Sequence, residues 1–340
     1  MRALRLFGDR DTRLVEVPDP PPPGPGEVRL RMRAVALNHI DVWGWRGMAF
    51  AKRTLPLTVG AEAVGEVVAL GEGVEGWRVG QRAVPYGAQT CGHCPACREG
   101  RDNLCENVTG VMGFHLDGFA QELVNQQARL CVPVPEGVST EDAACAAITF
   151  STVEHMLFDN ARLEPGETIL VHAAGSGIGT VAVKMAKAIG CTVIATAGSD
   201  EKCAQARALG ADHVVNYATD RFESVARKVT KKRGVDVVFE HVGATTWAGS
   251  LLSLRMGGRL VTCGSTSGVS AETNLMMLFQ RQLRITGSFG ASLRNVADGL
   301  AKMAGGLTPV LDTVAPLEGF AAALERLEGR RVFGKLVVTL

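Results

Sequence analysis

The 340-residue chain has no long apolar run, no block of like charge and almost no excess of charge of one sign. No segment is apolar over the length that spans a bilayer, and Met1–Phe7 predicts a first strand, not a signal peptide. The 36 basic and 35 acidic side chains give a formal net charge of +1, which argues against nucleic acid or an anionic membrane as a partner. We therefore expect a cytoplasmic protein.

Internal repeats and low-complexity segments are also absent, and the length favours two domains. Over residues 1–125, short strands alternate with Pro and Gly clusters, which predicts a barrel-like β unit. The strands expected there are Glu27–Ala36, Ala63–Leu70, Gln81–Val84 and a stretch around Phe119–Val124.

Beyond residue 140, expected strands and helices alternate. Ser139 precedes an Ala-rich run as a helix N-cap does, and further helices are expected at Val181–Ile189 and Glu201–Leu209. The expected strands are Thr168–Ala173, Thr192–Ala197, His213–Asn216, Val235–Glu240, Arg259–Cys263 and Arg284–Ser288, with a final strand at Lys335–Leu340. Six apolar strands in this alternation predict an α/β fold with a doubly wound parallel sheet of the Rossmann type.

Four of the nine cysteines are clustered with the spacing C-x2-C-x2-C-x7-C: Cys91, Cys94, Cys97 and Cys105. Four thiolates on a short loop containing Gly and Pro can close tetrahedrally on Zn²⁺ and leave no open coordination position. The spacing therefore predicts one structural zinc per chain, with four unrelated thiols or an iron–sulfur cluster as alternatives. The other cysteines are scattered, which is typical of packed apolar positions.

A glycine-rich turn follows the strand that begins at Thr168 and opens a helix. Small residues make such a turn tight, and backbone N–H groups at the helix start can face a pyrophosphate. The turn therefore predicts a dinucleotide site. Its expected contacts are Gly175, Ser176, Gly177, Ile178 and Gly179.

The end of the following strand bears on the choice of dinucleotide. In NAD-binding proteins a carboxylate about 20 residues beyond the glycines hydrogen-bonds the ribose 2′-hydroxyl, and residues 195–197 contain no carboxylate. Ser199 and Lys202 are suited to a 2′-phosphate, whereas Asp200 is the residue that favours NAD. Tyr217, after the third strand, is a candidate adenine contact. We expect NADP(H), with NAD(H) as the alternative.

Over nearly its whole length the chain resembles the medium-chain dehydrogenase/reductase superfamily. The β-rich part resembles its GroES-like catalytic domain, and the cysteine lobe resembles the structural zinc lobe of zinc alcohol dehydrogenases. Residues Ala143–Leu157 and the glycine turn are similar to the quinone oxidoreductase branch. The resemblance implies a catalytic domain of residues 1–147 and 288–340, a zinc lobe at about 90–106, a Rossmann domain of residues 148–287 and a homo-oligomer, either a dimer or a tetramer.

Zinc alcohol dehydrogenases hold a second, catalytic zinc with a cysteine, a histidine and a later cysteine. By this resemblance the three positions are Asn38, Ala61 and Ile148, so an amide and two aliphatic side chains replace the ligand set. Without that Lewis acid, a quinone or a conjugated C=C is easier to reduce than an alcohol is to oxidise, because the acceptor delocalises the incoming charge.

The resemblance thus implies an NADPH-dependent reductase of small-molecule quinones or α,β-unsaturated carbonyls. Two alternatives stay open: an alcohol dehydrogenase with a non-standard active-site metal, and a crystallin-like cofactor-binding protein without turnover. Metal content and turnover separate the three.

Three residues are candidate catalytic residues. Asn38 is expected to hydrogen-bond the acceptor oxygen, and His115 to offer a proton or a hydrogen bond. Trp43 is expected to line the substrate cleft together with Trp45, with an aromatic pair that packs the edge of the barrel as the alternative.

Further cofactor contacts are expected at the ends of strands and in the catalytic domain. His39 resembles a family residue near the pyrophosphate, and Thr152 is a candidate contact at the start of the Rossmann domain. Ligands of open α/β sheets lie at the carboxyl ends of strands, so His241, Val242 and Gly264 are expected near the nicotinamide half.

Overall fold

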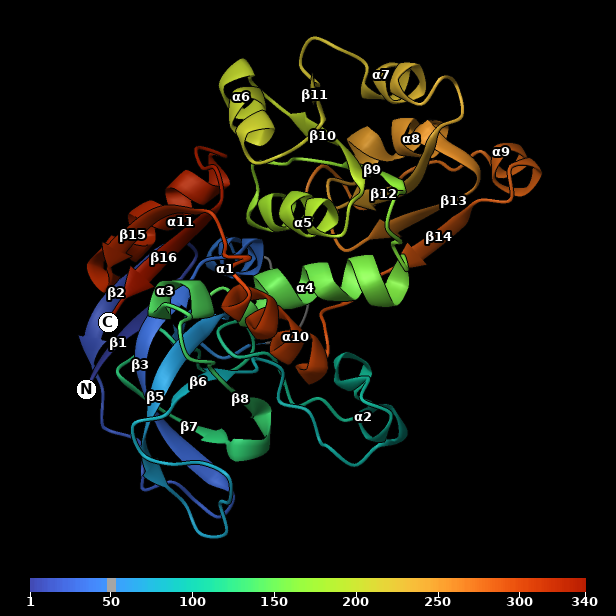
Figure 1. Ribbon diagram of the computed structural model, residues 1–340. Coiled ribbons are helices and arrows are strands. Elements are labelled where there is room, and N and C mark those ends of the chain that lie inside the picture. The colour runs from blue at the N-terminus through green and yellow to red at the C-terminus, as the bar shows by residue number, and fades with distance from the viewer. Residues whose placement is uncertain (48–52) are drawn as a thin grey trace. The chain divides into compact units, whose positions relative to one another are not determined.

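The computed structural model describes residues 1–47 and 53–340, which form two compact units (Figure 1). Unit 1 comprises Met1–Ser151 and Ala291–Leu340, and unit 2 comprises Thr152–Gly290. The sequence predicted that the catalytic domain would end at residue 147 and resume at residue 288. In the structure, unit 1 ends at Ser151 and resumes at Ala291. The fold class is the predicted one: a β-rich unit and an α/β unit with a parallel sheet. No helix among the described residues is long and apolar enough to cross a membrane.

Unit 1 is built on a seven-stranded sheet whose strand order is β15-β16-β3-β5-β6-β8, with β7 also paired to β3. A separate three-stranded sheet has the order β2-β1-β4. The strands are β1 (Arg2–Gly8), β2 (Asp11–Glu16), β3 (Glu27–Ala36), β4 (Leu57–Thr58), β5 (Ala63–Leu70), β6 (Arg82–Pro85), β7 (Leu123–Gln127), β8 (Cys131–Pro133), β15 (Leu311–Pro316) and β16 (Lys335–Thr339).

Alternation along β3 explains its place at the centre of this sheet. Val28, Leu30 and Met32 are at most 1% exposed, while the residues between them are at least partly exposed. Because successive side chains of a strand point to opposite faces, one face of β3 forms core. The helical segments of unit 1 are α1 (His39–Trp45), α2 (Pro95–Arg98), η1 (Asp102–Leu104), η2 (Ala128–Leu130), α3 (Thr140–Ala143), the π-helical η3 (Ala146–Phe150), α10 (Leu293–Ala304), η5 (Leu317–Gly319) and α11 (Phe320–Glu328).

Unit 2 contains a six-stranded sheet, all parallel, in the order β11-β10-β9-β12-β13-β14. Its strands are β9 (Thr168–Val171), β10 (Thr192–Ala197), β11 (His213–Asn216), β12 (Val235–Glu240), β13 (Leu254–Thr262) and β14 (Arg284–Gly287). The chain starts at β9, winds outward to β11 and returns to β12 on the other side of β9. This reversal is the topological switch point at which open α/β sheets bind ligands.

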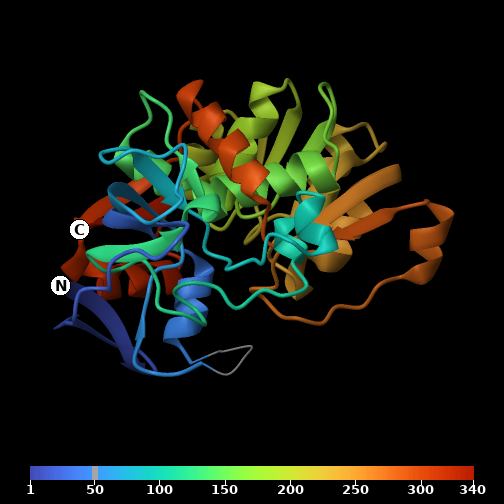
Figure 2. The same ribbon diagram turned by 90° about the horizontal axis from the view of Figure 1, so that it is seen from below.

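Helices cover this sheet. They are α5 (Gly177–Ala188), α6 (Asp200–Ala208), α7 (Phe222–Val229), α8 (Ala244–Ser253) and α9 (Leu275–Gln280), and α4 (Ser151–Glu154) runs into the π-helical η4 (His155–Asn160). Helix α5 packs on β9 and β10, and α8 packs on β12 and β13. Strand β14 is the last strand of the sheet, and it lies with α9 at the rim of unit 2 (Figure 2).

Several element limits differ from the sequence-based ones. Strand β7 lies at Leu123–Gln127, not around Phe119–Val124, because residues 119 and 120 instead bond to the backbone of residues 59 and 60. Strand β6 begins and ends one residue later than expected. Strand β13 begins at Leu254, five residues early, across an irregular register at its glycine pair. Helix α5 begins at Gly177, four residues before the apolar periodicity, because Ser176 caps it.

Candidate functional site

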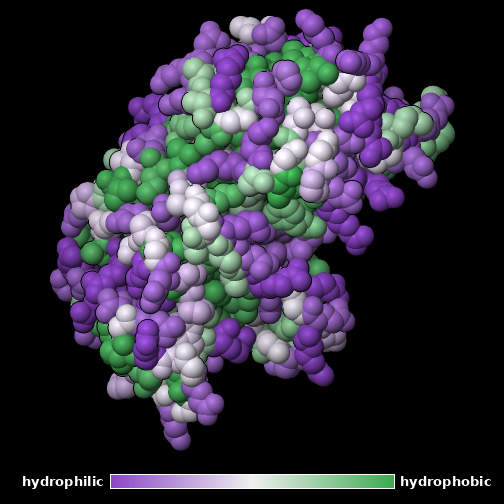
Figure 3. All heavy atoms as spheres, viewed as in Figure 1, coloured by the Kyte–Doolittle hydropathy of each residue, from purple (hydrophilic) through white to green (hydrophobic). Residues whose placement is uncertain are grey.

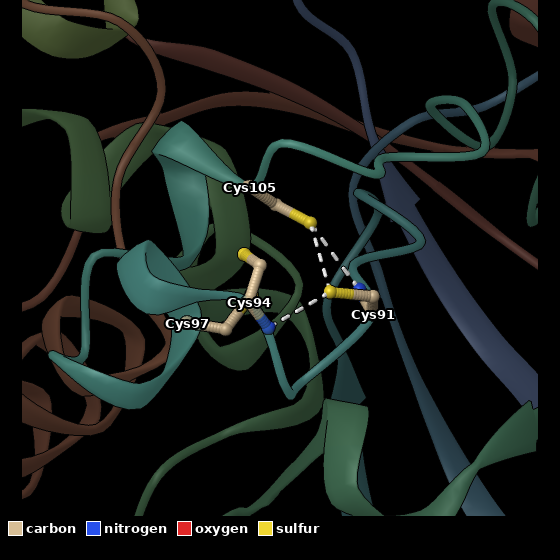
Figure 4. A group of neighbouring side chains, drawn as sticks. All are labelled: Cys91, Cys94, Cys97 and Cys105. Carbon is tan, nitrogen blue, oxygen red and sulfur yellow. Dashed lines mark hydrogen bonds between the residues drawn. The ribbon is translucent and has the colours of Figure 1, made fainter.

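The four-cysteine lobe brings all four sulfurs together. Any two of the four Sγ atoms lie within 4.8 Å of one another, and those of Cys91 and Cys105 are 3.6 Å apart (Figure 4). A tetrahedral Zn²⁺ with Zn–S bonds of about 2.3 Å requires sulfurs roughly 3.8 Å apart. This is the only such metal-binding cluster among residues 1–47 and 53–340. The donor set and its spacing fit a structural zinc.

Short segments set the lobe's geometry. Cys94 is the N-cap of α2, with Pro95 at its first position, and Cys97 lies in the same turn of helix. The N–H of Cys94 donates to the Cys91 sulfur at 3.3 Å, and the N–H of Cys91 donates to the Cys105 sulfur at 3.3 Å. A backbone N–H at His93 lowers the pKa of Cys91 to about 6, which favours the thiolate that metals bind.

In unit 1 a single carboxylate, that of Glu62, bonds to two of the three positions at which the resemblance implied replaced zinc ligands, Asn38 and Ile148. Glu62 is fully buried, and its Oε1 accepts from the backbone N–H groups of Ile148 at 2.6 Å and Thr149 at 2.7 Å. Its Oε2 accepts from Asn38 Nδ2 at 2.9 Å. Ala61 is 1% exposed beside it. An amide, a methyl and an isoleucine supply no three-ligand zinc site, so these residues do not fit a catalytic zinc.

A lysine that the sequence analysis did not single out supplies positive charge at this place. Lys335, at the start of β16, is 2% exposed. Its Nζ lies 3.1 Å from Glu62 Oε2, and it donates to Asn38 Oδ1 at 2.8 Å and to the Leu37 carbonyl at 2.7 Å. All three ammonium protons thus have acceptors. The only available signal was a lysine heading an otherwise apolar strand.

These contacts occupy both N–H groups and the carbonyl oxygen of the Asn38 side-chain amide. Its Nδ2 donates to Glu62 and, at 3.2 Å, to the Ala36 carbonyl, while its Oδ1 accepts from Lys335. Donation to a substrate oxygen therefore requires one of the two N–H bonds to open, and the bond to Ala36 is the longer. Asp41 caps the backbone N–H of Asn38, and burial raises the pKa of Asp41 to about 6.

The other candidates of unit 1 lie in α1 and a turn. His39 and Trp43 sit one helical turn apart, with ring centroids 6.5 Å apart, and both are partly exposed. Trp45 is instead 4% exposed and belongs to the core, so it is not a wall residue. His115 Nδ1 accepts from the Val111 N–H at 3.2 Å. Burial and then Arg53 lower the pKa of His115, so it is a neutral hydrogen-bond donor through Nε2.

In unit 2 the glycine turn connects β9 to α5 at the switch point. Ser176 is the N-cap of α5, and its hydroxyl accepts from the N–H of Gly179 at 3.0 Å. A Cβ on Gly179 would lie 2.3 Å from the Ala173 carbonyl oxygen, so only glycine allows this close turn. Ala173 itself has a left-handed φ of 44°. The turn holds the predicted contacts Gly175, Ser176, Gly177, Ile178 and Gly179 in one short segment.

The end of β10 carries the residues expected to select the dinucleotide. Ser199 is the N-cap of α6 and accepts from the N–H of Lys202 at 3.3 Å. Tyr217 is 46% exposed and lies against Gly198. Asp200 Oδ1 accepts from Asn216 Nδ2 at 2.8 Å, so this carboxylate is already bonded to the end of β11.

The predicted residues after β12 and β13 lie side by side. A Cβ on Gly264 would come within 2.8 Å of the His241 carbonyl oxygen, and the Val242 carbonyl accepts from the N–H of Ser267 at 2.7 Å. The His241 side chain is 8% exposed and donates to the His172 carbonyl at 2.8 Å, so any cofactor contact at His241 uses its backbone. Thr152 is partly buried in α4.

Two family models match this protein, one in unit 1 and one that covers most of unit 2 and continues into unit 1. Residues 24–136 match the alcohol dehydrogenase GroES-like domain, and residues 177–307 match the zinc-binding dehydrogenase family. The chain is 32% identical to acryloyl-coenzyme A reductase of Metallosphaera sedula, over 89% of each chain. It is 32% identical to quinone oxidoreductase of Salmonella typhimurium, over 73% of this chain and 67% of that one. A solved NAD-dependent alcohol dehydrogenase matches over 100% of both chains with a TM-score of 0.94 and 39% identity.

The fold, the glycine turn and these matches define an NAD(P)-dependent oxidoreductase of the alcohol dehydrogenase-like type. Within that class the chain belongs to the zinc-binding dehydrogenases of the medium-chain dehydrogenase/reductase superfamily.

Proposed function

We propose that this protein is an NADPH-dependent reductase of quinones or α,β-unsaturated carbonyls that works by direct hydride transfer without a catalytic zinc. The observation that carries the proposal is the buried Lys335–Glu62 pair, bonded to Asn38 where the family would place a zinc ligand. An ammonium ion has no open coordination position, so it cannot replace the Lewis-acidic metal that alcohol oxidation uses, and the protons of Lys335 are already donated within the protein. A conjugated acceptor needs less help, because it spreads the incoming charge itself.

The residues of unit 1 bind and orient the acceptor in this proposal. The nicotinamide cofactor, when bound, supplies the hydride. Asn38 donates to the acceptor oxygen by releasing its bond to Ala36, and Trp43 limits the size of the acceptor. His115 stays neutral and holds the oxygen through Nε2–H, which leaves water as the source of the final proton. The names of the relatives agree, since acryloyl-coenzyme A carries a conjugated C=C and a second relative is a quinone oxidoreductase.

The proposal is tested by comparing kcat/KM for a panel of quinones and enones with NADPH against kcat/KM for primary alcohols with NADP⁺. We expect the conjugated acceptors to be better substrates by at least about a hundredfold, since the zinc-type electrostatic aid of several kcal/mol is missing for alcohols. Treatment with a strong chelator should leave the rate with quinones unchanged over the first turnovers. Fast, chelator-sensitive alcohol oxidation would overturn the proposal.

A second candidate is an NAD-dependent alcohol dehydrogenase with a non-standard metal site, which the 39% identity to a solved enzyme of that name favours. The two candidates differ in metal content. The reductase proposal requires about one zinc per chain, all of it in the cysteine lobe. About two equivalents after removal of loosely bound metal would favour the dehydrogenase.

We further propose NADP(H) as the preferred cofactor, bound by the glycine turn and by Ser199, Lys202 and Tyr217. The support is that β10 ends without a carboxylate and that Asp200 is engaged with Asn216. His39, Thr152, His241, Val242 and Gly264 are proposed as further contacts.

Replacing Lys202 by Ala is expected to weaken NADPH binding by about 1.5–3 kcal/mol, the value of one charge-assisted hydrogen bond. NADH, which has no 2′-phosphate, should bind the variant as it binds the unaltered protein. Fluorescence titration with both cofactors measures this. Equal losses for NADPH and NADH, or equal affinities before the substitution, would contradict the assignment.

We also propose that the protein is a cytoplasmic homo-oligomer in which a second copy covers the β14 edge of unit 2. Strand β14 is unpaired on its outer side within the described sheet, and exposed apolar side chains lie close to it in sequence. These are Leu275, Met276, Phe279, Ile285 and Phe289, which are 36–73% exposed. Figure 3 shows apolar atoms over α9. An unpaired strand edge beside exposed apolar side chains is a surface on which another chain can pair or pack. The mass of the protein in solution tests this.

A further inference from the structure

The interior of unit 2 contains a group of polar side chains directly beneath the switch point of the sheet. His172 follows β9, Glu240 ends β12, Ser250 lies in α8 and Thr196 lies in β10. All four are at most 1% exposed. Buried polar groups are costly unless each finds a partner, so four of them at one place require an account.

Hydrogen bonds link these four side chains into one series, in which each group donates to the next, from Thr196 through His172 and Ser250 to Glu240. We call this series the hydrogen-bond chain. Ser250 Oγ donates to Glu240 Oε2 at 2.7 Å, so its oxygen is left to accept from His172 Nε2, 2.9 Å away. A neutral imidazole carries its single proton there and accepts at Nδ1, 3.2 Å from Thr196 Oγ1. The Thr196 hydroxyl in turn accepts from the backbone N–H of Ala173 at 3.1 Å. The tautomer follows from the network, because every donor then has an acceptor.

The charge states agree with this assignment. Burial lowers the pKa of His172 to about 4, so the imidazole is neutral at physiological pH. The pKa of Glu240 lies below its usual value although burial acts to raise it, and the Ser250 hydroxyl and the backbone N–H groups of Val242 and Gly243 all donate to its carboxylate. The acceptor at the end of the chain is therefore a carboxylate.

At both ends of the hydrogen-bond chain, a side chain accepts hydrogen bonds from backbone N–H groups near the switch point. Glu240 Oε1 accepts from the N–H groups of Val242 at 2.7 Å and Gly243 at 3.1 Å, which fixes the turn after β12. At the other end, Thr196 holds Ala173, whose φ of 44° is one that a non-glycine residue adopts only when its surroundings impose it. Ala173 is also the residue whose carbonyl closes on Gly179.

We infer that Glu240, Ser250, His172 and Thr196 are positioning residues that preset the glycine turn for the dinucleotide through this buried hydrogen-bond chain. The inference rests on the proposed placement of the cofactor at Gly175–Gly179. It is independent of the acceptor and of the choice between NADPH and NADH. A turn that is held before binding loses less conformational freedom when the pyrophosphate arrives.

Each test variant removes one hydroxyl group and leaves the volume of the buried side chain nearly unchanged. Ser250→Ala removes the hydroxyl that bridges His172 and Glu240, whose Nε2 and Oε2 lie 3.6 Å apart, and Thr196→Val removes the hydroxyl that holds Ala173. Ser253→Ala is the matched control, because Ser253 is also fully buried in α8, and its hydroxyl donates to the Gly249 carbonyl of the same helix at 2.8 Å. Thr196→Ser restores the hydroxyl and should rescue.

We expect Ser250→Ala and Thr196→Val to raise the Kd of the preferred reduced cofactor about threefold to tenfold, the effect of one neutral hydrogen bond. The KM for the cofactor should rise in proportion, with kcat changed by less than about twofold. Ser253→Ala and Thr196→Ser should stay within about twofold of the unaltered Kd. Imidazole ¹⁵N NMR should show His172 as the Nε2–H tautomer, and as a tautomer mixture in Thr196→Val, where Nδ1 loses its donor.

If Ser250→Ala and Thr196→Val change the Kd no more than Ser253→Ala does, the hydrogen-bond chain contributes only to the packing of the core, and the inference is wrong. Gly179→Ala separates this result from a misplaced cofactor, because its Cβ disturbs the turn directly. Loss of binding in Gly179→Ala without loss in the chain variants would overturn only the inference. Unchanged binding in Gly179→Ala would overturn both the placement of the cofactor and the inference.

Discussion

Replacing Lys335 by Met is expected to lower the free energy of unfolding by about 3–5 kcal/mol, because it leaves a buried carboxylate without its cation. Glu62 is fully buried, and the Lys335 ammonium lies 3.1 Å from it. The four N–H and O–H donors from Asn38, Ile148 and Thr149 that remain on Glu62 offset part of its desolvation but carry no charge. Urea-induced unfolding at neutral pH measures the loss.

Two further variants make this result specific. Lys187→Met removes the lysine of an exposed pair, in which Nζ lies 2.8 Å from Asp212 and both side chains are about one-third exposed; it should cost about 1 kcal/mol or less. The double variant Lys335→Met, Glu62→Gln should recover part of the loss, because the unpaired charge is gone. A loss below about 1 kcal/mol in Lys335→Met alone would show that the buried pair does not stabilise the site.

Replacing Cys97 by Ser is expected to abolish zinc binding, from about one equivalent per chain to nearly none, because a structural tetrahedral site does not tolerate the loss of a thiolate. Cys97 is buried within the lobe, and few other apolar side chains surround the four sulfurs. Since metal binding and local folding are coupled, the lobe should open. Elemental analysis gives the zinc content, and tryptic cleavage at the exposed Arg98 and Arg101 reports the opening.

Cys203→Ser serves as the control, because Cys203 is also buried but lies in α6, outside the cluster. That variant should keep its zinc and resist trypsin like the unaltered protein. The thermal midpoint of Cys97→Ser should fall by several degrees, since Asp102 of the lobe also accepts from the N–H of Leu293 at the start of α10. An unchanged thermal midpoint in a zinc-free Cys97→Ser protein would show that the zinc has no structural role.

Local patterns in the sequence predict much of this protein because the physics behind them is local. The period-2 alternation of Glu27–Ala36 and the apolar run Val235–Glu240 give the limits of β3 and β12 without correction. The close cysteine spacing predicts a cluster within a loop too short to separate its sulfurs. Small residues between a strand and a helix predict the turn at Gly175–Gly179, since N-capping and tight turns involve neighbours in sequence.

Partners distant in sequence could not be predicted in this way. Lys335 lies 273 residues from Glu62, and a lysine at the head of an apolar strand has no local property that names its partner. The chain from Thr196 through His172 and Ser250 to Glu240 joins two strands, a helix and a turn, and only the order of the parallel sheet makes them neighbours.

The sequence by itself therefore determined the two domain types, the glycine turn and the four-cysteine lobe, and its resemblance to the superfamily implied the loss of the catalytic zinc ligands. Only the tertiary structure decided which side chains surround Asn38 and which buried side chains are hydrogen-bonded to the backbone beside the glycine turn. The physical reason is that a buried charge or polar group must be matched by whatever the fold brings within about 3 Å, and that match is a property of packing and not of sequence neighbours.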